Sequence, residues 1–412
     1  MSWVLGLRCR ECGRSHALEP VAACPECWGA LLPEYDLERA RRTFTRETIA
    51  ARPRDLWRYR ELLPIAGQPR VGRGSGFTPL LPAPRLARAL GVRELWIKHD
   101  AACFPTLSFK DRLVAVALTK AVEFGLDTVG CASTGNLANA VAAGAAAAGL
   151  RAVVLVPEDL EPAKLQATAV HGATLIGVRG NYDRVNRLCA EIADRHRFGL
   201  VNVNLRAYYG EGSKTVGFEV CEQLGWRVPG HVVAPMAGGS LISKVERAFR
   251  QLHDLGLIDA PDCRLHGAQA QGCAPIVEAW KSGAAALRPV KPNTLVRSLA
   301  IGDPADGLSA LQTIRRTGGR AEDPDDREVV DGLRLLAETE GLFCETAGGT
   351  VVAAARRLAR DGAFADGRPV VLLITGHGLK TADVLGDARP FAGVIDGSLD
   401  EFDALWSERA AA

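Results

Sequence analysis

The sequence predicts an α/β protein with two doubly wound, mostly parallel lobes and a small zinc-ribbon-like element at the N-terminus. Short apolar runs of strand length alternate with helix-length amphipathic segments, which is typical of parallel sheets covered by helices. Polar or glycine-rich loops follow several of these runs. Two CxxC pairs near the start of the chain indicate the ribbon.

The composition fits a large globular enzyme. The 412 residues are 47% hydrophobic and 24% charged, so the chain can bury a core that divides into two or more lobes. A net charge of +2 and 6% aromatic residues speak against nucleic-acid binding as the main role. No apolar run reaches the roughly 18 to 20 residues that span a bilayer. The N-terminus lacks a secretory signal pattern, so we expect a cytoplasmic protein without membrane contact.

The N-terminal element is predicted from Cys9, Cys12, Cys24 and Cys27. Two CxxC pairs separated by eleven residues can present four thiolates tetrahedrally to one Zn²⁺. Four protein ligands leave no open coordination position, so we expect a structural metal rather than a catalytic one. The alternative is a set of unrelated reduced thiols.

Eight apolar runs are the expected strands of the two sheets. Before them, residues 36–61 are rich in Arg and Glu and are broken at Pro53, which predicts one or two short helices. The expected strands are residues 94–98, 128–132, 152–156, 173–178, 200–203, 231–236, 264–269 and 369–375. Ligands of such sheets bind at the carboxyl ends of the strands, so the loops there form the candidate site.

Lys110, in the segment PTLSFKDR, is the candidate covalent centre. Ser108 is a suitable N-cap and apolar residues recur at helical spacing from Phe109 onward, so Lys110 falls in the first turn of a helix. The positive end of the helix dipole disfavours a cation there, which lowers the lysine pKa and leaves more free amine. A free amine can form an imine with an aldehyde. The alternative is an ordinary lysine paired with Asp111 or Asp100.

Three loops at expected strand ends carry polar or small residues. Residues 133–136 place hydroxyls, an amide and backbone N–H groups at a helix start, which suits a carboxylate. Residues 237–241 form a small-residue turn into a helix, which suits a phosphate. The strand at 369–375 ends on Thr375, whose hydroxyl could bond a heterocyclic nitrogen, and His377 is expected to be a hydrogen-bonded scaffold residue. Each loop alone also fits an ordinary helix start.

Together, the motifs SFKDR, ASTGN, EGSKT, the glycine-rich turn and TGHGLK resemble the threonine synthase family. This family belongs to the tryptophan-synthase-like, fold-type II pyridoxal phosphate enzymes. The resemblance spans roughly residues 70 to 385, and the CxxC ribbon is similar to one carried by some members. It implies a tryptophan synthase β-like fold, a homodimer, and a carbon–oxygen lyase of threonine biosynthesis. The implied reaction converts O-phospho-L-homoserine and water to L-threonine and phosphate by γ-elimination and β-addition.

The resemblance also implies a division of the chain. We expect the ribbon in residues 1–36 and a larger, cofactor-holding lobe in residues 37–130 and 206–395. A smaller, substrate-closing lobe would comprise residues 131–205, and residues 396–412 would form a C-terminal tail.

The resemblance implies a role for each motif. Lys110 would form the internal imine, Asn136 would bond the 3′-oxygen of the cofactor, and Thr375 would face its pyridine nitrogen. Phe109 would help to position the ring. The implied contacts of the cofactor phosphate are Ala237, Gly238, Gly239, Ser240 and Leu241. The implied contacts of the substrate are Ser133, Thr134 and Asn136 for its carboxylate, and Arg206 and Lys214 for its phosphate.

One position departs from the family pattern. Many members have Arg two residues before the EG pair, where this chain has Tyr209, so either Arg206 replaces it or the leaving group is held differently. The alternatives within the group are β-replacement on O-phosphoserine, as in cysteate synthase, and a dehydratase acting on threonine or serine. The alternative from another class is an inactive homologue that serves as a binding module.

Overall fold

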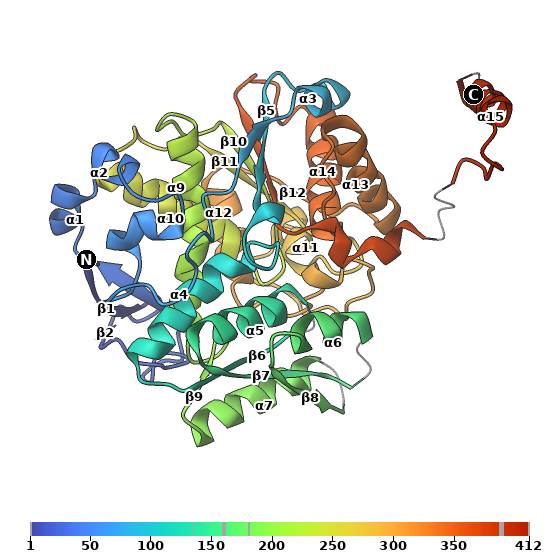
Figure 1. Ribbon diagram of the computed structural model, residues 1–412. Coiled ribbons are helices and arrows are strands. Elements are labelled where there is room, and N and C mark those ends of the chain that lie inside the picture. Colours follow the sequence, from blue (N-terminus) through green and yellow to red (C-terminus); the bar gives the residue numbers. More distant parts are fainter. Residues whose placement is uncertain (1, 134, 159–161, 180–181, 387–390, 411–412) are drawn as a thin grey trace.

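The chain folds around two central sheets, with a third, small sheet near the N-terminus (Figure 1). The computed structural model describes residues 2–133, 135–158, 162–179, 182–386 and 391–410. The predicted α/β class with two mostly parallel sheets is confirmed.

The larger sheet has six strands in the order β12-β11-β10-β13-β5-β4. All neighbours are parallel except β4, which runs antiparallel to β5 at one edge. The strands are β4 Leu80–Pro82, β5 Leu95–His99, β10 His231–Pro235, β11 Arg264–Ala268, β12 Ala321–Glu322 and β13 Val370–Ile374. Every residue of β10 and β13 is buried, which explains why these strands appear in the sequence as uninterrupted, mainly apolar runs.

The smaller sheet has four parallel strands in the order β8-β7-β6-β9. They are β6 Thr128–Ala132, β7 Arg151–Pro157, β8 Thr174–Val178 and β9 Phe198–Leu200. The expected strand at 200–203 starts two residues earlier than predicted and ends at Leu200. The chain turns there, and Val201 N–H donates to the Gly130 carbonyl at 2.9 Å. The other seven expected strands match within one residue.

Helices cover both faces of the sheets, with α5 and α7 on opposite sides of the smaller one (Figure 1). The α-helices are α1 Leu37–Thr43, α2 Arg46–Ala50, α3 Pro84–Leu90, α4 Lys110–Glu123, α5 Asn136–Ala148, α6 Pro162–Ala169, α7 Tyr182–Arg195, α8 Arg206–Tyr209, α9 Lys214–Gln223, α10 Ser240–Asp254, α11 Pro275–Lys281, α12 Gly307–Arg316, α13 Asp326–Glu340, α14 Thr346–Arg360 and α15 Leu399–Ala410. The 3₁₀ helices are η1 Leu56–Leu62, η2 Asp100–Ala102, η3 Gly210–Ser213, η4 Arg297–Leu299, η5 Gly378–Lys380 and η6 Ala382–Leu385. The one or two short helices expected in residues 36–61 are α1 and α2, and the segment also contains most of the 3₁₀ helix η1, which was not expected.

The N-terminal sheet is antiparallel and has the order β2-β1-β3. Its strands are β1 Val4–Cys9, β2 Ser15–His16 and β3 Leu31–Tyr35. The N-terminal segment that contains this sheet is hydrogen-bonded to the rest of the chain at separate points. Arg10 Nη2 donates to Gln312 Oε1 of α12 at 2.8 Å, and the Tyr208 hydroxyl donates to the Glu19 carbonyl at 2.8 Å. The N-terminal segment is therefore packed against the rest of the structure.

Helix α15 lies apart from the main body at the end of the chain (Figure 1). Phe402 and Trp406 stack on its exposed surface with ring centroids 6.2 Å apart. Among the described residues, no helix is both long and apolar enough to cross a membrane.

Candidate active site

Lys110 lies at the carboxyl end of β13, one of the two middle strands of the larger sheet. The backbone N–H of Phe109 donates to the Thr375 carbonyl at 2.9 Å, and Ser108 pairs with Gly376 in an isolated antiparallel bridge. These bonds fix the segment before α4 against the strand end. Because α4 starts at Lys110, the lysine is presented from the first position of the helix.

The predicted N-cap at Ser108 is wrong by one residue. Phe109 occupies the cap position without a side-chain bond, because Ser108 is held in the bridge with Gly376. The Ser108 hydroxyl is buried and has no hydrogen-bond partner among the described residues. A buried hydroxyl without a partner costs free energy, so this oxygen is a candidate for a ligand contact.

The Lys110 amine has an environment that favours its neutral form. Its Nζ lies 4.6 Å from the centroid of the Phe109 ring and 5.8 Å from that of Tyr209. Burial lowers the pKa of Lys110 to about 8. The Glu345 carboxylate has the opposite, smaller effect and raises it. The predicted direction of the shift is correct, and burial is its largest cause. At pH 7 about a tenth of the amine is therefore free, far more than for a lysine with an ordinary pKa.

The acidic residues considered as partners of Lys110 are bonded elsewhere. Asp111 accepts from the Thr106 hydroxyl at 2.7 Å and from the Thr106 N–H at 3.0 Å. Asp100 accepts from two nitrogens of Arg112. The alternative of an ordinary lysine paired with Asp111 or Asp100 is therefore wrong.

Asn136, the first residue of α5, is hydrogen-bonded at both ends of its amide. Nδ2 donates to the two carboxylate oxygens of Glu345 at 3.1 and 2.8 Å, and Oδ1 accepts from Lys380 Nζ at 2.8 Å. The Glu345 carboxylate also raises the pKa of Lys110, so the same carboxylate influences both Lys110 and Asn136. Neither Glu345 nor Lys380 was given a role from the sequence. The only local signal was a glutamate among small and apolar residues in CETAGG, immediately before a helix.

The polar loop before α5 has a partly exposed start. The Ser133 hydroxyl accepts from the Gly135 N–H at 3.3 Å, and Gly135 is the N-cap of α5 without a side-chain capping bond. Gly135 has no side chain to cap the first N–H groups of α5, so among the described residues these groups remain candidates to bind an anion. Thr134 lies outside the described residues.

The glycine-rich turn connects β10 to α10 and is open where a phosphate would lie. Gly239 has φ +90° and is the N-cap of α10, again without a side-chain capping bond. A Cβ on Gly238 would meet no atom within 4 Å, whereas one on Gly239 would lie 2.7 Å from the Asp306 carbonyl oxygen. The turn thus combines free space, uncapped N–H groups and the positive end of a 15-residue helix.

Arg206 and Tyr209 of α8 lie on the side of the site formed by the glycine-rich turn. Arg206 Nη2 pairs with Asp306 Oδ1 at 2.8 Å, and the Asp306 N–H donates to the Gly238 carbonyl at 2.9 Å. Burial raises the pKa of Tyr209 well above its usual value, so its hydroxyl remains protonated. The Arg206 guanidinium is about one-third exposed (35%) and makes no other ion pair among the described residues.

Lys214 lies in a different environment. Its ammonium is fully buried and donates to the Leu62 carbonyl at 2.9 Å, to Gln251 Oε1 at 3.0 Å and to Glu211 Oε2 at 2.6 Å. All three protons have protein acceptors, so none is left for a substrate phosphate. This geometry does not support the role expected for Lys214.

Thr375 and His377 follow β13 on the same edge of the sheet. Thr375 is buried, and its carbonyl binds the segment that carries Lys110. His377 Nδ1 accepts from the Leu379 N–H at 3.2 Å and so caps η5, as expected of a scaffold residue.

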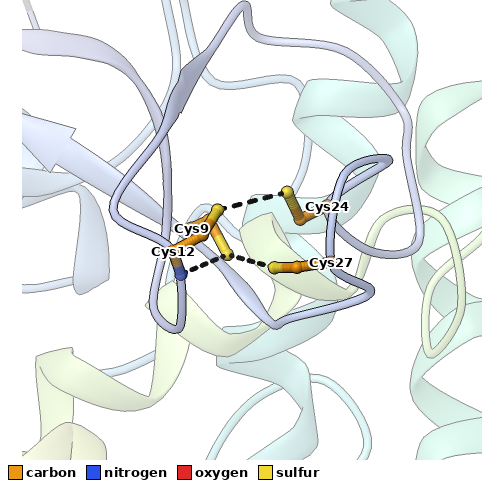
Figure 2. A group of neighbouring side chains, drawn as sticks. All are labelled: Cys9, Cys12, Cys24 and Cys27. Atoms are coloured by element: carbon orange, nitrogen blue, oxygen red, sulfur yellow. Dashed lines mark hydrogen bonds between the residues drawn. The ribbon is translucent and has the colours of Figure 1, made fainter.

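The four N-terminal cysteines converge from two loops (Figure 2). The sulfur atoms of Cys9 and Cys27 are 3.4 Å apart and those of Cys12 and Cys24 are 3.8 Å apart, and all four lie within 4.8 Å of one another. Tetrahedral Zn²⁺ with bonds of about 2.3 Å requires sulfur separations of about 3.8 Å. His16 Nε2 lies 3.4 Å from Cys24 Sγ and can donate to a thiolate there. The cluster fits one metal ion.

Comparison with known proteins agrees with this arrangement. Residues 71–376 match a family model described as pyridoxal-phosphate dependent enzyme. The threonine synthase of Methanocaldococcus jannaschii is 36% identical over 379 residues, which cover 91% of this chain and 93% of that protein. The threonine synthase of Methanosarcina acetivorans is 36% identical over 397 residues, which cover 96% of both chains.

Solved structures show the same fold at lower identity. Maize serine racemase superposes with a TM-score of 0.60 at 19% identity, covering 80% of this chain and 93% of that chain. The processed form of threonine deaminase isoform 2 from Solanum lycopersicum gives a TM-score of 0.63 at 20% identity, covering 75% of this chain and 81% of that chain.

Proposed function

Because the chain belongs to the pyridoxal-phosphate dependent enzymes and, within them, to the threonine synthase family, we propose that it converts O-phospho-L-homoserine and water to L-threonine and phosphate. The observation that carries this proposal is the 36% identity over 96% of both chains with the Methanosarcina acetivorans threonine synthase. A match of that extent includes the substrate side of the site as well as the cofactor side.

The residues at the strand ends fit pyridoxal phosphate. The open space at Gly238 and the uncapped start of α10 suit its phosphate, and the buried, unpartnered Ser108 hydroxyl offers a further polar contact. Lys110 supplies an amine whose pKa is lowered to about 8, so that it loses its proton more readily than an ordinary lysine. The proposed cofactor contacts are Phe109, Lys110, Asn136, Ala237, Gly238, Gly239, Ser240, Leu241 and Thr375.

Pyridoxal phosphate, when bound, condenses its aldehyde with an amine and withdraws electrons from the carbon atoms next to it. The protein must then move protons at the substrate. With a pKa of about 8, the Lys110 amine can take the proton from Cα and then one proton from Cβ. Loss of the Cβ proton lets phosphate leave from Cγ. Cγ is then protonated, water adds at Cβ, and a proton returns to Cα.

The substrate is held at its two charged ends. We propose that Ser133, Thr134 and Asn136 hold the carboxylate at the start of α5. We propose that Arg206 holds the substrate phosphate, since its guanidinium is partly exposed beside the glycine-rich turn. Asp306 orients that guanidinium through the 2.8 Å ion pair. The neutral Tyr209 hydroxyl is available as a donor in place of the family's arginine.

The cysteine cluster is proposed to hold a structural Zn²⁺. Sulfur separations close to the tetrahedral value and the nearby His16 support this choice. A homodimer and the division into lobes at residues 131 and 205 are further proposals that rest on the family resemblance, and we also propose a cytoplasmic location. Sedimentation of the purified holoenzyme would test the dimer.

Phosphate release tests the proposed reaction. The purified protein, loaded with pyridoxal phosphate, should release inorganic phosphate from O-phospho-L-homoserine with threonine as co-product in equal amount. Lys110→Ala should abolish this turnover. Phosphate release from O-phosphoserine alone would overturn the proposal in favour of β-replacement, and a folded protein that takes up no cofactor would indicate a binding module.

A further inference from the structure

Two residues that the proposed reaction does not use hold the Asn136 side chain. Lys380, the last residue of η5, donates to Asn136 Oδ1 at 2.8 Å. Glu345, the N-cap of α14, accepts from Asn136 Nδ2 through both carboxylate oxygens. The three residues come from separate elements, so the arrangement is a property of the tertiary fold.

The chemistry of these partners fixes which way the amide faces. A lysine ammonium can only donate, so it must meet the amide oxygen, and an ionised carboxylate can only accept, so it must meet the amide nitrogen. A flipped amide would lose both bonds. One Nδ2 hydrogen can serve both Glu345 oxygens, and the other has no acceptor among the described residues.

Glu345 is itself held rigidly. It is 3% exposed, and its N–H donates to the Gly376 carbonyl at 2.9 Å. A Cβ on Gly376 would overlap the Glu345 carboxylate, so the glycine makes room for it. Burial raises the pKa of the Glu345 carboxyl, against Asn136, Lys380 and Lys110, which lower it. Burial lowers the pKa of Lys380, against Glu345 and Asp111, which raise it. The carboxyl group of Glu345 therefore lies near both lysines.

We propose that Lys380 and Glu345 are positioning residues that fix the Asn136 amide, so that its free Nδ2 hydrogen is presented to the ring oxygen of the bound cofactor. This inference rests on the proposed function, because it needs pyridoxal phosphate at Lys110. The same contacts join the two sheets at the site. Asn136 follows β6 of the smaller sheet, whereas Glu345 and Lys380 belong to the elements around β13 of the larger sheet.

A double-mutant cycle tests whether Lys380 acts through Asn136. The variants are Lys380→Met, Asn136→Ala and their combination, and the readouts are the dissociation constant of pyridoxal phosphate and the pH midpoint of its absorbance change. Lys380→Met should weaken cofactor binding about tenfold, as expected for one charge-assisted hydrogen bond, and should move the midpoint. In the Asn136→Ala background, adding Lys380→Met should change the dissociation constant less than twofold.

Two further variants serve as controls. Lys291→Met removes an exposed lysine and should leave both readouts unchanged. Lys380→Arg keeps a cationic donor and should restore part of the affinity lost in Lys380→Met. Affinities are measured below the melting temperature of each cofactor-free variant, so that a destabilised fold does not enter the comparison.

Fully additive effects of Lys380→Met and Asn136→Ala would overturn the inference, because Lys380 would then act independently of Asn136. An unchanged dissociation constant and midpoint in Lys380→Met would overturn it too. If the unmodified protein binds no pyridoxal phosphate, the proposed function itself is wrong, and the inference, which depends on it, is wrong with it.

Discussion

Arg112 and Asp100 form a two-point ion pair in the protein interior, with Nε donating to Oδ2 at 2.7 Å and Nη2 donating to Oδ1 at 2.8 Å. Arg112 is completely buried and lies two residues after Lys110 on α4. It also donates to both oxygens of Glu219 on α9, and Glu219 in turn accepts from Lys98 of β5 at 2.6 Å. This network locks the helix that carries Lys110 to the larger sheet.

Arg112→Met should destabilise the fold strongly. The substitution leaves the Asp100 and Glu219 carboxylates buried with fewer cationic partners, and removing one partner of a buried ion pair costs roughly 3–5 kcal/mol. The free energy of unfolding from urea titration measures the loss. Arg85→Met, at an exposed position on α3, should stay within about 0.5 kcal/mol of the unmodified protein. Equal stability of the two variants would contradict this role of Arg112.

Two neighbouring glycines should respond differently to alanine. In Gly238→Ala the added methyl group meets no protein atom but occupies the proposed phosphate space, so cofactor affinity should fall while stability changes by no more than about 1 kcal/mol. In Gly239→Ala the methyl group is strained at φ +90° and crowds the Asp306 carbonyl, so stability should fall as well. Cofactor titration and thermal melting separate the two effects. Normal affinity in Gly238→Ala would argue against a phosphate at this turn.

The cysteine cluster should control metal content more than chemistry. Cys9→Ser combined with Cys24→Ser removes one thiolate from each CxxC pair, so bound zinc should fall from about one ion per chain to nearly none, with a lower melting temperature. Elemental analysis by mass spectrometry checks this. Cys263→Ala, a buried thiol outside the cluster, should keep its zinc. An unmodified protein that is stable and free of metal would dismiss the zinc site.

A buried histidine pair should make the fold sensitive to acid. Arg320 N–H donates to His266 Nδ1 at 3.0 Å, so His266 carries its proton on Nε2 and donates to His231 Nδ1 at 3.1 Å. His231 then donates from Nε2 to Asp366 Oδ1 at 2.9 Å, and both rings are neutral. Burial, with help from His231 and nearby arginines, lowers the pKa of His266 to about 3.

Because the pKa of His266 is lower in the folded protein than in the unfolded chain, the neutral His266 ring contributes to the free energy of unfolding. This contribution is fully present above pH 6.5, the ordinary histidine pKa, and is lost as the pH falls toward 3. Between pH 7.5 and 5, His266 alone should account for about 2 kcal/mol of lost stability. His266→Gln preserves an acceptor and a donor without titrating, so its stability should depend less on pH. Urea unfolding at both pH values measures this, and identical pH dependence in the two proteins would refute it.

The strands and the positions of the loops that follow them could be predicted because they depend on local patterns. Buried parallel strands such as β10 and β13 appear as uninterrupted apolar runs, and small or polar residues directly after a strand mark its functional end. The short strands β4 and β12 have only three and two residues, which is too short for a periodic signal.

The charged contacts of the site could not be predicted in the same way. Glu345 lies 209 residues from Asn136 in sequence, and only the tertiary fold brings the starts of α14 and α5 together. Lys214 has the sequence context of a ligand-binding lysine, yet α9 directs it into the core, where Leu62, Gln251 and Glu211 accept its protons. Such partners depend on how the two sheets pack, which a local motif does not contain.

Reductive trapping measures directly whether Lys110 is the residue that bonds the cofactor. The protein is loaded with pyridoxal phosphate, reduced with borohydride and digested, and the modified lysine is located by mass spectrometry. We predict modification at Lys110, and its loss from that peptide in Lys110→Ala. If the reduced cofactor is found on Lys380 or on any other lysine, and Lys110 is unmodified, the assignment is contradicted.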